Sequence, residues 1–290
     1  MENINSVNEI QKNLLIWFSL NGRHWIPWKL NSDGSLPQSG EFISPYGVWI
    51  AEVMLQQTQL NVVIPYWQNW MQTFPFLVDL VEADEQKVLL KWQGLGYYSR
   101  AKRLYQSSKL LLNQIDINNI ADPRSWPVEI DEWIALPGIG RSTAGSIISS
   151  AFDLPAPILD GNVKRIISRL LAIEGKSSKD QKKLWGFSTF LSVKSPRNIN
   201  QALMDLGSKV CTSRNPTCSI CPLKNNCIAY LKYDPIYFPK KGMQKSSHHE
   251  EIGIALVFNK DGELLIDQRR ESSSMGGMWE FPGGKKEAAE

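Results

Sequence analysis

Hydrophobic residues recur at intervals of three and four along most of the chain, the spacing that places them on one face of an α-helix. The pattern predicts helices near residues 8–18, 48–57, 62–74, 85–96, 101–112, 163–173 and 199–210. Prolines and glycines at positions 75, 94, 96, 127 and 155 interrupt it, and no repeat of fixed period is present. Residues 1 to about 230 are therefore expected to be mainly α.

The pattern changes near residue 233. Residues 233–249 are rich in Pro, Lys and Ser and lack periodic hydrophobic positions, which is typical of a linker. Residues 252–258 and 264–270 flank the turn-forming residues 259–263, which predicts a β-hairpin, and residues 279–284 look like a further extended segment. We expect residues 250–290 to be the start of a second unit, too small to fold independently.

Composition narrows the class of protein. The chain has 290 residues, 42% of them hydrophobic and 21% charged, which suits a globular protein with room for two domains. No stretch is apolar enough to span a bilayer and the N-terminus has no signal-peptide pattern, so we expect a cytoplasmic protein without membrane contact. The net charge of +3 permits an anionic partner without demonstrating one.

All four cysteines lie in one segment. Their spacing in a long chain without a secretion signal favours a metal site over disulfides. Four thiolates match the ligand count of a 4Fe-4S cluster, whereas structural zinc sites usually pair their cysteines in two short hooks. Only Cys218 and Cys221 are close enough to form such a hook. The spacing therefore favours a 4Fe-4S cluster, with zinc as the alternative, and the predicted ligands are Cys211, Cys218, Cys221 and Cys227.

The stretch "ALPGIGRSTAGSII", residues 135–148, places Gly138 and Gly140 in a turn between two helical segments. Glycine lets the backbone approach another molecule closely, and the first N–H groups of a helix lack intrahelical partners. The turn and helix start could therefore hold a DNA phosphate. For an isolated G-x-G, a plain connector between helices is the commoner interpretation.

Two carboxylates stand in distinctive positions. Glu52 lies among apolar residues of a predicted helix, where burial would raise its pKa and favour a proton donor, although an exposed helical Glu is equally compatible. Asp160 precedes Gly161 at a predicted helix start, where it could be an N-cap that stays ionised and also serve catalysis. A protonated Glu with an ionised Asp is the pair that cleaves glycosidic bonds.

These features together resemble the helix-hairpin-helix superfamily of base-excision DNA glycosylases, and within it the MutY family of adenine DNA glycosylases. The resemblance extends over residues 20–230. It is carried by the cysteine loop and by "GRHWIPW", "EVMLQQTQ", "VIPYW", "GLGYYSRA", "LPGIGRSTAG", "ILDGNVKR" and "ALMDLG".

The resemblance implies a helix-hairpin-helix glycosylase domain over residues 1–232. It would comprise a six-helix barrel at about 40–145 and a second module, formed by the remainder with the N-terminus, that holds a 4Fe-4S cluster in the loop 211–227. Double-stranded DNA would lie between the modules with the target base flipped out. The implied substrate is adenine opposite 8-oxoguanine or guanine, and the protein is expected to be a monomer.

The resemblance also implies residue roles. Glu52 would protonate adenine N7, and Asp160 with Asn162 would stabilise the sugar cation and guide water. Ser142 occupies the place of the lysine nucleophile of endonuclease III and cannot form a Schiff base, which predicts a monofunctional enzyme; Lys164 could still trap product. Further DNA contacts fall on Gln57, Thr58, Leu95, Tyr97, Gly138, Gly140 and Ser142, with barrel packing as the alternative for Gln57, Thr58, Leu95 and Tyr97.

Residues 250–290 resemble the start of an α+β Nudix-fold domain, with Gly284 and Glu290 matching the opening of its signature. In the family this domain helps to recognise 8-oxoguanine, and the later part of it is not present here. The polar insert at residues 31–42 departs from the family pattern. Two alternative functions remain: an endonuclease III-type glycosylase/lyase acting on oxidised pyrimidines, and a non-catalytic iron–sulfur DNA-binding protein.

Overall fold

The computed structural model describes residues 4–240, 249–270, 273 and 276–286. Its two compact units are Met1–Gly242 and Met243–Glu290, and each is considered by itself. In the part that the structure describes, no helix is both long and apolar enough to cross a membrane.

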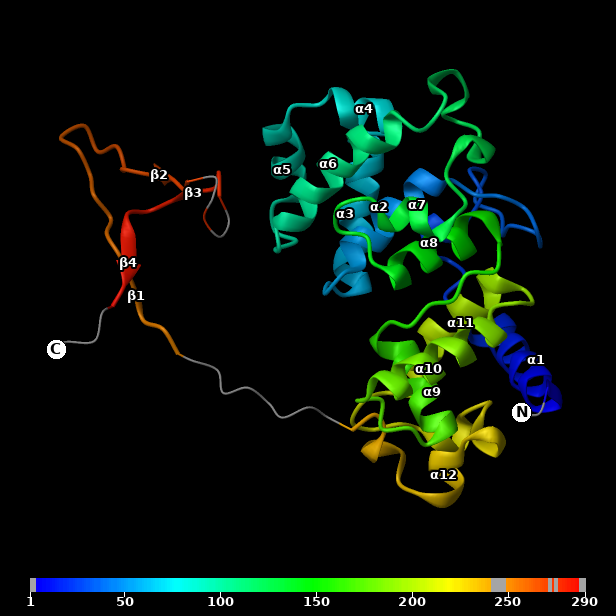
Figure 1. The fold of residues 1–290 in the computed structure, drawn as a ribbon. Coiled ribbons are helices and arrows are strands. Elements are labelled where there is room, and N and C mark those ends of the chain that lie inside the picture. The colour runs from blue at the N-terminus through cyan, green and yellow to red at the C-terminus, as the bar shows by residue number, and fades with distance from the viewer. Residues whose placement is uncertain (1–3, 241–248, 271–272, 274–275, 287–290) are drawn as a thin grey trace. The chain divides into compact units, whose positions relative to one another are not determined.

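The first unit is helical, as the periodicity predicts (Figure 1). Short 3₁₀ turns connect some of the helices, including η1 (Pro27–Lys29) and η6 (Pro235–Tyr237). The helices are α1 (Ile4–Asn21), α2 (Pro45–Leu55), α3 (Leu60–Thr73), α4 (Leu77–Glu82), α5 (Glu85–Trp92), α6 (Ser99–Leu112), α7 (Ile130–Ile134), α8 (Arg141–Phe152), α9 (Gly161–Leu171), α10 (Ser178–Leu191), α11 (Pro196–Lys209) and α12 (Ile228–Lys232).

The helices from α2 through α8 share a first hydrophobic core, and we call this group of helices the barrel module. Helix α2 is its centre, with nine of eleven residues buried. A helix that is apolar on every side belongs inside a bundle, which explains why α2 is surrounded by its neighbours. The indole rings of Trp49, Trp70, Trp92 and Trp133 fill the space around it.

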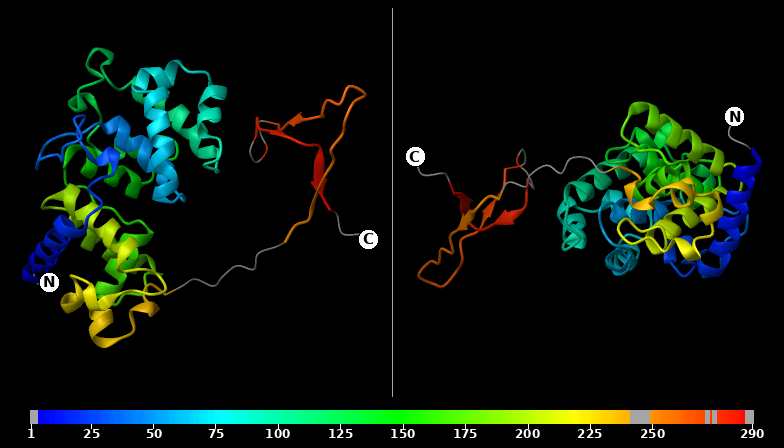
Figure 2. Two further views of the ribbon diagram at one scale, coloured as in Figure 1. Left: turned by 180° about the vertical axis from the view of Figure 1, so that it is seen from behind. Right: turned by 90° about the horizontal axis from the view of Figure 1, so that it is seen from below.

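A second core joins α1 to α9, α10 and α11, and we call this group, with α12, the second module. The N-terminal helix is thus far in sequence from the helices it packs on, and Gln11 Nε2 donates to the Leu191 carbonyl at 2.9 Å. The views in Figures 1 and 2 place α1 beside α10 and α11, away from α4 to α6. Helices α8 and α11 pack against each other and connect the two modules.

The insert at residues 31–42 is fastened to the end of α8. Gly40 N donates to Asp153 Oδ2 at 2.8 Å, and Ile43 N donates to the Ala151 carbonyl at 2.9 Å. The buried guanidinium of Arg197, from α11, binds the carbonyls of Glu41 and Ser150. The insert therefore has a defined place where the two modules meet.

The predicted linker begins too early. Arg169 Nε donates to the Pro235 and Phe238 carbonyls at 2.8 and 3.0 Å, and Lys240 N donates to the Glu174 carbonyl at 3.0 Å. Residues 235–240 therefore belong to the helical unit. Residues 241–248 of the predicted linker lie outside the described residues.

The second unit contains two short antiparallel pairs. Strand β1 (Ile252–Ile254) pairs with β4 (Gly283–Lys285), and β2 (Asp267–Gln268) pairs with β3 (Trp279–Glu280). The predicted hairpin of 252–258 with 264–270 is confirmed next to its turn, where Phe258 bridges Leu264 and Leu265 N donates to the Val257 carbonyl at 2.8 Å. Further from the turn the prediction is wrong, because β1 and β2 pair with other strands and alternation of apolar residues fixes a face but not a partner strand. Gly284 lies opposite Gly253, whereas Glu290 is outside the described residues.

Candidate active site

A cavity of about 1040 Å³ is lined by residues of both modules. Helices α2 and α8 contribute Glu52, Ser142 and Ser146 to its wall. The second module contributes Asp160 and Asn162 from the start of α9. Residues separated by more than a hundred positions thus share one solvent-accessible space, which is large enough for a nucleotide.

Glu52 is half-buried on the central helix α2. Burial raises the pKa of its carboxyl to about 7, with a further contribution from the negative charge of Asp160. Ser146 and Lys29 oppose this rise. The Ser146 hydroxyl opposes the rise more strongly than Lys29 does. Glu52 therefore holds a proton near neutral pH, as a general acid must.

Asp160 is both an N-cap and a cavity residue. Its Oδ1 accepts from Val163 N at 2.7 Å at the start of α9, so the capping interpretation is correct and does not exclude a chemical role. Burial raises the pKa of this carboxyl above its ordinary value. The N–H groups of Val163 and Asn162 and the charge of Arg165 oppose that rise.

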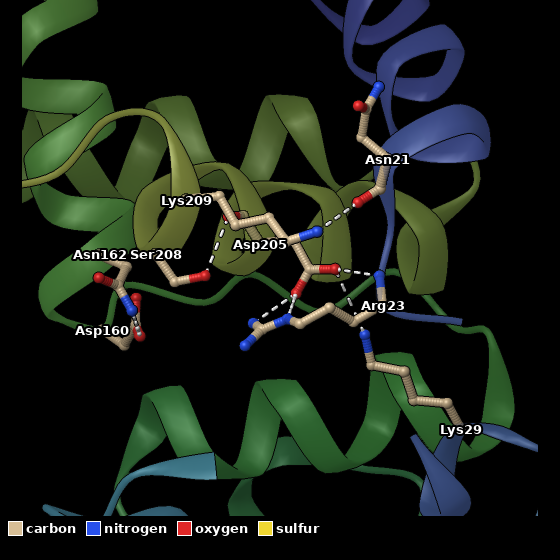
Figure 3. A network of polar contacts seen from close by, with 8 residues as sticks. All are labelled: Asn21, Arg23, Lys29, Asp160, Asn162, Asp205, Ser208 and Lys209. Atoms are coloured by element: carbon tan, nitrogen blue, oxygen red, sulfur yellow. Dashed lines mark hydrogen bonds and ion pairs between the residues drawn. The ribbon is translucent and has the colours of Figure 1, made fainter. Parts of the chain in front are cut away.

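Asn162 is oriented by contacts on both sides. Its Nδ2 donates to Asp160 Oδ2 at 3.4 Å, and its Oδ1 accepts from Arg165 at 2.8 Å. Gly207 of α11 lies so close that a Cβ there would be 2.6 Å from the Asn162 Cβ. Figure 3 shows the side chains of Asp160 and Asn162 facing each other, near Asp205, Ser208 and Lys209 of α11.

The sequence analysis did not identify a charged network on the same cavity (Figure 3). Asp205 is 1% exposed and accepts from the backbone N and the Nε of Arg23, both at 2.7 Å. Lys29 Nζ lies 3.8 Å from Asp205 Oδ2, and burial lowers the pKa of this amine to about 8. The sequence signal for this network was a charged residue within each of two largely apolar motifs, Arg23 in "GRHWIPW" and Asp205 in "ALMDLG".

The glycine turn lies between α7 and α8. Gly138 has φ +83°, a conformation that disfavours other residues, whereas Gly140 has an ordinary φ and open space where a Cβ would stand. Gly140 caps α8 without a side-chain hydrogen bond. Ser142 lines the cavity, and its Oγ accepts from Leu159 N at 3.0 Å.

The other predicted DNA contacts differ in exposure. Tyr97 is 60% exposed, Gln57 is exposed without lining the cavity, and Thr58 lines the cavity. Leu95 is 6% exposed and belongs to the core of the barrel module. For Leu95 the barrel-packing alternative therefore accounts for the residue better than the predicted DNA contact does.

All four cysteines line one small cavity of the second module together with Arg169. Arg169 donates to Cys211 Sγ at 3.2 Å, and burial raises the pKa of Cys221 to about 12. Buried thiols of this kind become thiolates when a metal supplies the opposite charge. Within the described ranges, however, no three or more His, Cys, Asp or Glu side chains are arranged to hold a metal ion.

Comparison with known proteins identifies the families that the two parts of the chain match. Residues 50–186 match the model of the HhH-GPD superfamily of base excision DNA repair proteins, and residues 253–290 match the NUDIX domain. The fold is therefore that of a helix-hairpin-helix DNA glycosylase.

Individual relatives are more specific. The chain is 35% identical over 272 residues to the adenine DNA glycosylase of Buchnera aphidicola from Schizaphis graminum, covering 93% of this chain and 73% of that one. It is 32% identical over 330 residues to the adenine DNA glycosylase of Mus musculus, covering 98% and 62%. The chain belongs to the adenine DNA glycosylase family and is an enzyme of that kind.

Solved structures share the fold. A thermostable thymine-DNA glycosylase superposes with a TM-score of 0.65 at 21% identity, covering 79% of this chain and 98% of that one. Endonuclease III in a non-covalent DNA complex superposes with a TM-score of 0.60 at 19% identity, covering 80% and 98%.

Proposed function

We propose that this chain hydrolyses the N-glycosidic bond of adenine in duplex DNA where adenine lies opposite 8-oxoguanine or guanine. One observation carries the proposal. Glu52 from the barrel module and Asp160 from the second module line the same cavity, and their charges interact. Because the bond is hidden in the base stack, the nucleotide must be extruded into this cavity first.

The two carboxyls divide the chemistry. Glu52, protonated near neutral pH, donates to adenine N7 and makes the base a better leaving group. Ionised Asp160 stabilises the positive charge that develops on the sugar. Asn162, held between Asp160 and Arg165, helps to place the attacking water.

The DNA backbone would contact the start of α8. The uncapped N–H groups after Gly140 and the open space beside it suit a phosphate. The exposed Tyr97 ring suits stacking beside the base opposite the adenine, and Gln57 and Thr58 would lie at the gap that the adenine leaves.

The enzyme is proposed to release the base without cutting the strand. Ser142 lines the cavity at the place where endonuclease III carries its lysine, and its hydroxyl cannot form a Schiff base. Lys164 does not line this cavity, so its capture of product would be incidental.

Cys211, Cys218, Cys221 and Cys227 would hold a 4Fe-4S cluster. The four cysteines line one cavity, and a group bonded to their sulfurs would fix the loop between α11 and α12. Purified protein should contain equal amounts of iron and acid-labile sulfide. Zinc without sulfide would contradict this assignment.

A single assay tests the function. The purified protein is incubated with duplexes containing A·8-oxoguanine, A·G or thymine glycol, and strand cleavage is measured with and without alkali. We expect adenine release from the first two duplexes and strand cleavage that requires alkali. Release confined to thymine glycol, or no release by cluster-replete protein, would refute the proposal. A cytoplasmic location and action as a monomer remain predictions.

A further inference from the structure

Arg100 of α6 makes an unusual set of contacts. The residue is 6% exposed, and its guanidinium donates to five backbone carbonyls and one hydroxyl. The acceptors at the end of α2 are Val53 O at 3.1 Å, Met54 O at 2.8 Å and Gln56 O, followed by Thr58 Oγ1 at 3.0 Å. The remaining acceptors are Leu95 O and Gly96 O, both at 3.2 Å.

These contacts satisfy the C-terminal end of the helix that carries Glu52. The last carbonyls of a helix have no intrahelical partner, and α2 has no basic residue in its own last turn. A cation from α6 fills that role and interacts favourably with the negative end of the helix dipole. The rings of Trp92 and Tyr97, 5.2 and 5.5 Å from the guanidinium carbon, offset part of the cost of burying the charge.

The same guanidinium joins two segments that each contain one strained, exposed residue. Gln57 has φ +60° and Tyr97 has φ +49°, in the left-handed region that non-glycine residues seldom adopt. Such conformations persist only where their surroundings hold them. Arg100 holds both segments. It donates to Gln56 O and Thr58 Oγ1 on either side of Gln57, and to the carbonyls of Leu95 and Gly96, which precede Tyr97.

We propose that Arg100 is a positioning residue that couples the two segments, residues 56–58 and 95–97, to the Glu52 helix. Resting on the proposed function, this means that seating Tyr97 in DNA and seating Glu52 at the extruded base are one event. The guanidinium transmits it, because the same side chain binds the residue directly after Glu52 and the residue directly before Tyr97.

A double-mutant cycle tests the coupling. Arg100→Lys keeps the charge but cannot reach both groups of carbonyls, and Tyr97→Ala removes the exposed ring. The readouts are the single-turnover rate of adenine release at saturating enzyme, duplex affinity, and the fluorescence of 2-aminopurine placed as the target base. We expect Arg100→Lys to lower rate and base extrusion together by about 10- to 100-fold, and the double variant to lose much less than the product of the single losses.

Arg197→Lys is the matched control. Arg197 is also buried, at 3% exposure, and also donates to backbone carbonyls, but those carbonyls belong to Gln38, Glu41, Ser150 and Ala151. We expect a comparable fall in melting temperature, a rate within about 3-fold of wild type, and effects that multiply with Tyr97→Ala.

The outcomes are distinguishable. Multiplying effects of Arg100→Lys and Tyr97→Ala, or an equal rate loss in Arg197→Lys, would overturn the coupling while wild-type activity stands. An inactive wild type would refute the proposed function, and the cycle in duplex affinity would still test the coupling. If Arg100→Lys does not fold, Thr58→Val removes one acceptor of the same guanidinium and enters the same cycle, with a smaller non-multiplying loss expected.

Discussion

The two carboxyls on the cavity wall belong to different backbone environments. Glu52 lies in the middle of α2, where every nearby N–H is used by the helix, whereas Asp160 stands at the start of α9, where N–H groups are free. Burial raises both pKa values, but Asp160 is opposed by two N–H donors and a guanidinium. The position of a carboxyl within its helix thus decides which groups oppose the rise in pKa that burial causes.

The variant that should break this contrast most strongly is Asp160→Asn. Asn is as good an N-cap as Asp, so α9 should keep its start while the negative charge beneath the sugar is lost. We expect adenine release to fall by about 10³-fold or more with near-normal duplex binding. Single-turnover kinetics and a binding titration measure the two quantities.

Its control is Asp116→Asn, a cap of the same chemistry on the exposed turn Ile117–Asn119. This change should leave the rate of base release unaltered. Comparable turnover by Asp160→Asn and wild type would remove Asp160 from the mechanism.

Glu52→Gln removes the proton donor and keeps the shape of the side chain. The rate should fall by about 10² to 10⁴-fold, the usual contribution of a general acid. Because the folded pKa of Glu52 is raised to about 7, its contribution to stability is lost as pH rises from the unfolded value towards 7. Melting temperatures should therefore favour the Gln variant at pH 8 and converge at pH 5.

The matched change for this variant is Glu85→Gln at the start of α5, outside the cavity, which should leave the rate of adenine release unaltered. Full activity of Glu52→Gln would exclude Glu52 as the acid.

Ser142→Lys should add an activity rather than remove one. The new amine would enter the cavity beside Asp160, at the cost of the hydrogen bond from Leu159 N. We expect strand cleavage without alkali and a borohydride-trapped covalent adduct. Ser142→Arg, which carries a cation but no amine nucleophile, should give neither, and absence of both from the Lys variant would place Ser142 away from the sugar.

Ser146→Ala should have the smallest effect, which sharpens the account of Glu52. Ser146 opposes the rise in the Glu52 pKa, as does Lys29, while Asp160 adds to it. The alkaline limb of the rate profile, near pH 7 in wild type, should move upward by about 0.5 to 1 pH unit when the hydroxyl is lost. Ser208→Ala, on the opposite wall, should not move it.

Periodic hydrophobic positions predicted most helices of the first unit, because each buries one apolar face. Helix α10 was missed, since its first six residues are all polar and only its last part follows the pattern. The hairpin predicted in the second unit is present only next to its turn, and the partners of the outer strands were predicted wrongly, because local alternation does not choose among partner strands.

The motifs located Glu52, Asp160 and the cysteines, since each stands in a recognisable local context. The network of Arg23 with Asp205 was not predicted, because its partners are 182 positions apart and only the packing of α11 brings them together. Arg100 was missed for the same reason, since its role depends on carbonyls of two other segments. A local sequence pattern does not predict which distant segments will come into contact.

The central claim is that Glu52 and Asp160 act on one extruded purine nucleotide. The most direct test is a crystal structure of the full chain with a duplex carrying 2′-fluoro-2′-deoxyadenosine, whose glycosidic bond resists cleavage, opposite 8-oxoguanine. The account predicts Glu52 within hydrogen-bond distance of N7 and Asp160 beneath C1′ of the same nucleotide. An extruded adenine in another cavity, or one that touches only one of the two carboxyls, would contradict it.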